Sequence, residues 1–150
     1  MEIGIPNGSS TGAARWQHGA RFSARPRIGR RLALVVDDDR DTRETLAILL
    51  TWAGHEVRTA ADGAEALAIA REFQPDLVFL DIAMPRVNGY EVCRQLRDSL
   101  DMHDADIFAL SGRSGSEHDE KCTTAGFTAQ LTKPFDPATL MSLGGAQRGR

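Results

Sequence analysis

Short apolar segments alternate with amphipathic segments along the chain from residue 32 onward. The apolar segments have the length of strands that are buried on both faces of a sheet, and they are Leu32–Val36, Val57–Ala60, Leu77–Leu80, Ile107–Leu110 and Ala129–Thr132. The amphipathic segments have helical spacing, and they are Thr42–Ala53, Ala64–Phe73, a segment that begins at Gly89, Ser114–Ala125 and Asp136–Leu143. This alternation predicts an α/β fold with a doubly wound, five-stranded parallel sheet, and right-handed crossovers favour the flavodoxin-like strand order 2-1-3-4-5.

The predicted helices carry typical start and stop residues. Asp62 is the expected N-cap of the second helix, and Asp39 or Asp41 is the expected N-cap of the first. Gly54 and Gly126 directly follow helical segments, where glycine favours an end.

Charge divides the chain into a basic start and an acidic body. Residues 1–31 carry six arginines and one acidic residue, and Gly, Ser and Pro leave no helical or alternating pattern there, so we expect a flexible extension. Residues 32–150 carry 12 basic and 20 acidic residues. Residues 32–143 are the expected domain, and residues 144–150 are the expected flexible tail. The basic extension leaves nucleic-acid binding open as an alternative, although the acidic body argues against nucleic acid as a partner.

Several classes of protein do not fit the composition. No apolar run approaches the roughly 20 residues that span a bilayer, so we expect no membrane partner, and no signal peptide is recognisable. Two cysteines cannot build a disulfide framework. We therefore expect a cytoplasmic protein.

Polar side chains stand at the ends of four predicted strands. They are Asp37, Asp38 and Asp39 after the first strand, Asp81 after the third, Ser111 after the fourth and Lys133 after the fifth. The carboxyl ends of parallel strands form one edge of the sheet, so these groups should converge. Converging carboxylates fit Mg²⁺, and a nearby ammonium fits a phosphoryl oxygen. The pattern predicts a phosphoryl-transfer site.

These residues resemble the receiver domain of two-component response regulators. The resemblance covers about residues 32–143 and rests on six segments: Val35–Asp38, Pro75–Pro85, Asn88–Val92, Ala109–Gly112, Ala125–Phe127 and Lys133–Phe135. The separations are similar to those of the family, with 43 residues from Asp38 to Asp81, 30 from there to Ser111 and 22 more to Lys133. The sequence of residues 125–137 also resembles that of receivers attached to hybrid histidine kinases.

The resemblance implies a role for each strand-end residue. Asp81 would accept a phosphoryl group from a histidine kinase or histidine phosphotransfer protein. Lys133 would pair with the phosphoryl group, Ser111 would turn toward it, and the Lys133–Pro134 bond would be cis. The protein would signal to a protein partner by conformational change, with a homodimer as one form, and would catalyse only its own phosphorylation and slow dephosphorylation.

The resemblance also implies the ligands of a Mg²⁺ cofactor. Asp38 and Asp81 would bind the ion directly, Asp37 would bind it through water, and the main-chain carbonyl of Ala83 would complete the set. One position departs from the family pattern: Gln130 stands three residues before the lysine, where many receivers have Tyr or Phe. We also expect no attached output domain and a short last helix.

An enzyme of another class remains as an alternative. Phosphatases of the haloacid-dehalogenase type also place aspartates after the first strand of a parallel sheet, and their nucleophile would be Asp37 instead of Asp81. The segment Asp37–Asp41 departs from that pattern, because Asp41 stands where such enzymes need Thr or Val.

Overall fold

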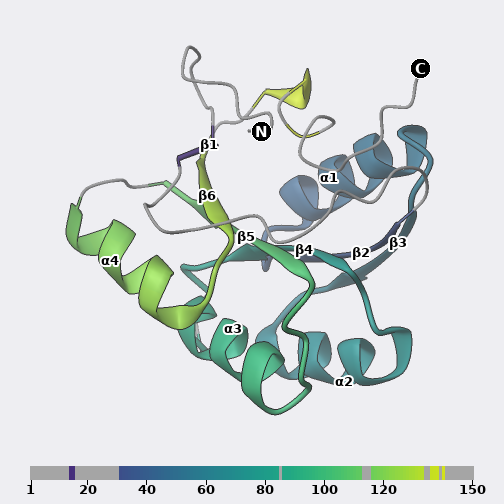
Figure 1. The fold of residues 1–150 in the computed structure, drawn as a ribbon. Helices are drawn as coiled ribbons and strands as arrows, with labels where there is room; N and C mark the ends of the chain where they lie inside the picture. The colour runs from purple at the N-terminus through teal and green to yellow at the C-terminus, as the bar shows by residue number, and fades with distance from the viewer. Residues whose placement is uncertain are drawn as a thin grey trace.

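The computed structural model describes residues 14–15, 31–84, 86–112, 116–133, 136–138 and 140. A six-stranded sheet runs through these residues in the order β1-β6-β5-β4-β2-β3 (Figure 1). Its strands are β1 (Ala14–Arg15), β2 (Leu32–Val36), β3 (Glu56–Ala60), β4 (Leu77–Asp81), β5 (Asp106–Ser111) and β6 (Ala129–Thr132). All pairs from β2 to β6 are parallel, which confirms the predicted α/β fold and the 2-1-3-4-5 order of its five parallel strands.

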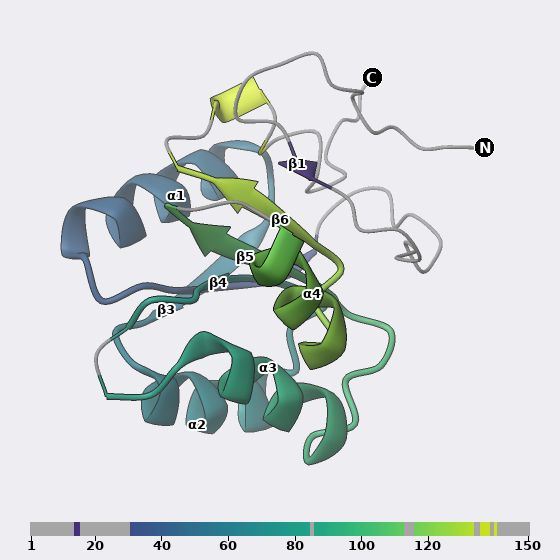
Figure 2. The ribbon, with the colours of Figure 1, turned by 90° about the vertical axis from the view of Figure 1, so that its left-hand side faces the viewer.

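Helices cover both faces of the sheet. They are α1 (Arg40–Trp52), α2 (Gly63–Phe73), α3 (Gly89–Asp98) and α4 (Ser116–Ala125). In Figure 2 α1 lies above the sheet and α2 and α3 lie below it. The core is divided accordingly: Leu46 and Leu50 of α1 pack with Phe79 on one face, whereas Val92 and Leu96 of α3 pack with Val78 and other residues on the opposite face.

The helix starts follow from short polar side chains. Asp39, Asp62 and Asn88 are the N-caps of α1, α2 and α3, and each side chain accepts a hydrogen bond from a backbone N–H of the first turn. Because Asp39 and not Asp41 is the cap, α1 begins at Arg40, two residues earlier than predicted. Gly54 and Gly126 have φ near +100°, a conformation that favours glycine, and they follow α1 and α4 as expected.

The N-terminal segment differs from the prediction in two ways. β1 pairs antiparallel with β6, which adds a strand that the apolar pattern did not predict. Arg31, assigned to the flexible extension, is only 5% exposed, so the extension ends before it. The rest of the extension, the Lys133–Pro134 bond and the tail at residues 144–150 lie outside the described residues; of the predicted last helix, Pro137, Ala138 and Leu140 are helical.

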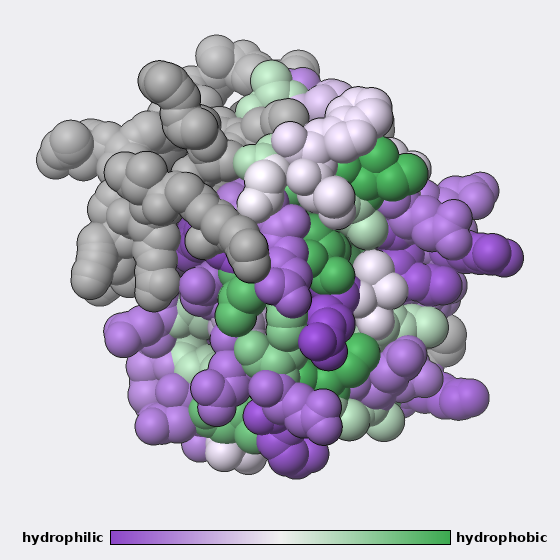
Figure 3. Space-filling view, turned by 90° about the vertical axis from the view of Figure 1, so that its right-hand side faces the viewer, coloured by the Kyte–Doolittle hydropathy of each residue, from purple (hydrophilic) through white to green (hydrophobic). Residues whose placement is uncertain are grey.

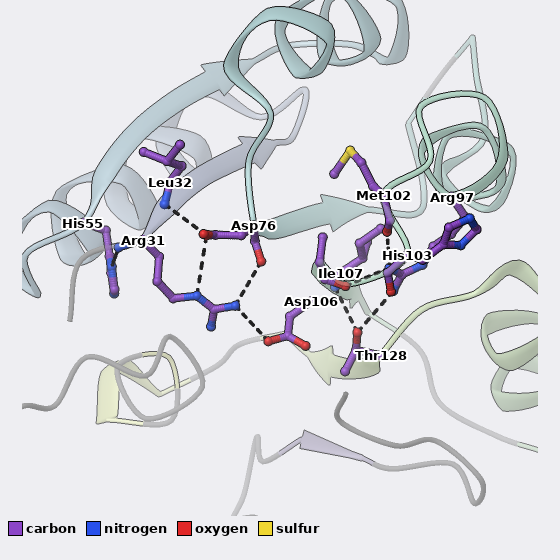
Figure 4. A network of polar contacts seen from close by, with 11 residues as sticks. Arg31, Leu32, His55, Asp76, Arg97, Met102, His103, Asp106, Ile107 and Thr128 are labelled. Atoms are coloured by element: carbon purple, nitrogen blue, oxygen red, sulfur yellow. Dashed lines mark hydrogen bonds and ion pairs between the residues drawn. The ribbon is translucent and has the colours of Figure 1, made fainter. Parts of the chain in front are cut away.

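Arg31 belongs to a polar network at the amino-terminal ends of the strands (Figure 4). Its Nη2 donates to Asp106 Oδ2 and to the carbonyl of Asp76, each at 3.0 Å. Its backbone N–H donates to Nδ1 of His55, a buried side chain. Asp76 in turn accepts from the N–H of Leu32. The network therefore joins the starts of β2, β4 and β5, at the opposite end of the strands from the predicted site.

No helix among the described residues is both long and apolar enough to cross a membrane.

Candidate functional site

Three carboxylates and one ammonium meet at the carboxyl ends of the parallel strands. Asp37, Asp38 and Asp81 each place a carboxylate oxygen within 4.8 Å of the others. The Nζ of Lys133 lies 3.3 Å from Asp37 Oδ2 and 3.8 Å from Asp81 Oδ2. The structure thus brings together residues from the ends of β2, β4 and β6, although 96 positions separate the first from the last.

Asp37 forms hydrogen bonds through its backbone N–H and through both carboxylate oxygens. Its backbone N–H donates to the carbonyl of Ala60 in the neighbouring strand at 3.2 Å. Its Oδ1 accepts from the N–H of Asp39 at 2.9 Å, and its Oδ2 accepts from Lys133. The side chain has no exposed surface, so a reactant has no direct approach to it.

Asp81 is buried but reachable. It is the last residue of β4 and keeps 5% of its surface exposed. Its Oδ1 accepts from the N–H of Ala83 at 3.1 Å, while Oδ2 faces Lys133. Burial and then the charge of Asp37 raise the pKa of Asp81 to about 6, against the opposing effect of Lys133. Ionisation of Asp81 is therefore disfavoured first by burial and then by the neighbouring charge of Asp37, and Lys133 offsets only part of this cost.

Ser111 and Ala83 lie at the rim of the same edge. Ser111 ends β5, is 5% exposed, and accepts at its carbonyl from the backbone N–H of Lys133 at 2.7 Å. That bond fixes the start of the loop that carries the lysine. Ala83 is exposed two residues after Asp81, and its N–H is directed to the Asp81 carboxylate.

Gly89 is a site residue that the sequence pattern identified only as a helix start. A Cβ at this position would lie 2.7 Å from the carbonyl oxygen of Asp81 and 2.7 Å from the Cα of Ile82. Its N–H donates to the carbonyl of Ile82 at 3.1 Å. The start of α3 therefore packs directly on the backbone of Asp81, and the absence of a side chain permits this approach.

Two further residues lie near Asp37: Arg43, which the sequence pattern did not single out, and Asp39, which was expected as a helix cap. Arg43 of α1 donates from Nη1 to the main-chain carbonyl of Asp37 at 2.9 Å. Asp39 is engaged as the cap of α1, where hydrogen bonds from the hydroxyl and N–H of Thr42 lower the pKa of its carboxyl group. Asp39 therefore stabilises the helix instead of adding a fourth carboxylate to the cluster.

The carboxylates of Asp37, Asp38 and Asp81 fit a hard divalent cation. Their ligand atoms are oxygens, and two of the three carboxylates are buried. Burial and the charge of Asp37 raise the pKa of Asp81, and a bound cation would oppose both effects. With one ammonium beside them, these groups suit a phosphoryl group that carries several negative oxygens.

Comparison with known proteins identifies the family of this chain. The family model of the response regulator receiver domain matches residues 33–143. Response regulator MprA of Mycobacterium sp. (strain KMS) is 45% identical over 102 residues, which are 68% of this chain and 44% of that protein, and MprA of Mycobacterium avium is 44% identical over the same shares. The chain thus spans less than half the length of these relatives.

Solved structures show the same fold. Chemotaxis protein CheY4 of Vibrio cholerae superposes with a TM-score of 0.72 at 33% identity, covering 78% of this chain and 96% of that one. The BeF3-activated DrrB receiver domain has a TM-score of 0.67 at 29% identity, covering 75% of this chain and 92% of that one. On its sequence, its fold and its family match, this chain belongs to the response regulator receiver domains of two-component systems.

Proposed function

We propose that this chain accepts a phosphoryl group on Asp81 from the phosphohistidine of a histidine kinase or histidine phosphotransfer protein, with Mg²⁺ as cofactor. The observation that carries the proposal is the reachable Asp81 carboxylate, which lies beside two further carboxylates and the ammonium of Lys133. The chain then acts as a signalling protein: the phosphorylated form changes its conformation and contacts a protein partner.

The surroundings of the carboxylates favour Asp81 over Asp37 as the acceptor. Both oxygens of Asp37 accept hydrogen bonds, and its side chain has no exposed surface. Asp81 retains exposed surface, and its Oδ2 lies 3.8 Å from the ammonium of Lys133. A phosphatase that uses Asp37 as its nucleophile would need the opposite arrangement.

The transfer needs one nucleophile and charge neutralisation. A carboxylate oxygen of Asp81 attacks phosphorus, the P–N bond of the phosphohistidine breaks, and the leaving imidazole nitrogen keeps the electron pair and takes up a proton. Lys133 pairs with a phosphoryl oxygen, and the hydroxyl of Ser111 donates to another. Asp38, Asp81, the main-chain carbonyl of Ala83 and, through water, Asp37 would hold Mg²⁺, which would neutralise part of the phosphoryl charge.

Labelling with a small phosphodonor tests the acceptor. With Mg²⁺ and radiolabelled acetyl phosphate, the wild type should gain one acid-stable, base-labile phosphoryl group, and Asp81→Asn should gain none, because an amide is a poor nucleophile. A chelator should abolish the labelling of the wild type. Asp37→Asn is the matched comparison, because it makes the same change at the neighbouring carboxylate. Full labelling of Asp81→Asn, or steady phosphate release that only Asp37→Asn abolishes, would rule the proposal out.

The exposed face of α1 supports a protein as the phosphodonor. Ile48 is 51% and Trp52 is 75% exposed, and with Ala47 and Thr51 they line a shallow pocket. Figure 3 looks onto the right-hand side of Figure 1, where hydrophobic residues reach the surface among hydrophilic ones. Because α1 runs from the aspartate cluster to Trp52, a donor that reaches Asp81 and extends along the helix also covers this face.

Truncating this face should slow transfer from a protein donor only. With a phosphorylated histidine phosphotransfer domain, Trp52→Ser should lower the transfer rate about 10-fold, as expected when an aromatic anchor is lost. Labelling by acetyl phosphate serves as the internal control and should not change. Equal rates for wild type and variant with the protein donor would contradict docking on α1.

A further inference from the structure

Asp38 is the exposed member of the three-carboxylate cluster, whereas Asp37 and Asp81 are buried. Among the described residues, no hydrogen bond or ion pair holds the Asp38 carboxylate in place. The direction in which this side chain leaves the main chain therefore depends on the two peptide units that flank it. One of them joins Asp37 to Asp38, and the other joins Asp38 to Asp39.

Each of these peptide units is held by one hydrogen bond. The N–H of Asp39, in the second unit, donates to Oδ1 of Asp37 at 2.9 Å. The carbonyl of Asp37, in the first unit, accepts from Nη1 of Arg43 at 2.9 Å. A bond from a guanidinium is stronger than one between neutral groups. The orientation of the first unit thus depends on a side chain that has no place in the transfer step.

Arg43 itself is fixed by the start of α1. Its backbone N–H donates to the carbonyl of Asp39, the N-cap residue, at 3.0 Å, and its side chain is partly buried. The side chain of Asp39 accepts from the N–H of Thr42 at 3.0 Å. The guanidinium of Arg43 therefore reaches the Asp37 carbonyl from a capped helical turn, and a rigid element of this kind can hold a ligand precisely.

We propose that Arg43 is a positioning residue for Asp38: its bond to the Asp37 carbonyl keeps the Asp38 carboxylate directed toward a divalent cation. This inference rests on the proposed function, which assigns Mg²⁺ to the cluster. Arg43 has two effects of opposite sign, because its positive charge alone repels a cation. Residues that orient metal ligands change metal affinity 10- to 100-fold in other proteins, whereas water and salt screen a partly exposed charge. The positioning effect should therefore prevail.

Titration of the full chain with Mg²⁺ and no phosphodonor, followed by the amide NMR shifts of Asp38 and Ala83, tests the inference. Arg43→Met should raise the Kd for Mg²⁺ about 10-fold. Arg40→Met is the matched control: it removes the same charge from the same turn of α1, where Arg40 pairs with Glu44 at the surface, and its Kd should stay within two-fold of the wild type. Arg43→Lys keeps a charged donor and should recover most of the affinity.

Labelling by acetyl phosphate gives a second readout. In Arg43→Met the Mg²⁺ concentration for half-maximal labelling should rise by the same factor as the Kd, and the rate at saturating Mg²⁺ should stay within two-fold of the wild type. Loss of stability alone would not produce this split. A Kd of Arg43→Met that is unchanged or lower, or an equal rise in Arg40→Met, would overturn the inference. Failure of the wild type to accept label rejects the proposed function instead, and the titration without donor still decides the role of Arg43.

Discussion

Replacing Arg31 with methionine is expected to lower the free energy of unfolding by about 2–4 kcal/mol, the largest loss of stability that we expect from one side chain outside the apolar core. Arg31 is buried, and its guanidinium contacts the carboxylate of Asp106 at 3.0 Å and that of Asp76 at 3.6 Å. Methionine keeps much of the apolar stem but leaves two carboxylates without their cation. Because both retain some exposure, water reduces the loss below that of a fully buried pair.

Urea denaturation of both proteins at neutral pH measures this loss. Arg40→Met is the matched control, since Arg40 forms an exposed pair with Glu44 one helical turn away. The control should change the free energy of unfolding by no more than about 0.5 kcal/mol. Similar losses in the two variants would show that the network at the strand starts contributes nothing specific.

The second prediction is an increase in the free energy of unfolding. In the absence of Mg²⁺, Asp81→Asn is expected to raise the free energy of unfolding at neutral pH by about 1–3 kcal/mol. The wild type must hold an ionised Asp81 beside Asp37, and burial together with that charge raises the pKa of Asp81 to about 6 from its ordinary value of 3.8. Asparagine occupies the same space without the charge.

The pKa of Asp81 determines how the stability of the wild type changes with pH. Because the pKa of Asp81 is higher in the folded than in the unfolded state, the folded state holds the proton more strongly. The wild type therefore loses stability as pH rises through the window from 3.8 to about 6, and keeps the full penalty above it. The gain in free energy of unfolding of Asp81→Asn over the wild type should be small near the lower limit of that window and constant above its upper limit.

Denaturation across this window, with a chelator present, measures the advantage. Adding Mg²⁺ should reduce the difference, because the ion binds the folded wild type. Asp98→Asn, an exposed carboxylate on α3, is the control and should stay within about 0.5 kcal/mol of the wild type at each pH. An Asp81→Asn protein less stable than the wild type at neutral pH would contradict the repulsion inferred at the site.

The sequence by itself determined the five parallel strands, the four helices α1 to α4 and the edge of the sheet at which the site lies. Apolar segments such as Leu77–Leu80 are local signals of buried strands, and caps such as Asp62 act on the next turn of chain, so both can be read from neighbouring residues. Parallel strands then force their carboxyl ends to one edge. This rule is why Asp37, Asp81 and Lys133 could be grouped before any distance was known.

Only the tertiary structure decided which side chains are buried and what they contact. Arg31 looked like one more arginine of the extension, yet it bonds to Asp106, 75 positions away. Gln130 looked like a departure from a family pattern, and its partner Asp119 lies on another element. The close packing of Gly89 on the backbone of Asp81 likewise depends on how two elements meet. Such contacts depend on the relative placement of distant segments, which no local pattern of apolar and polar residues encodes.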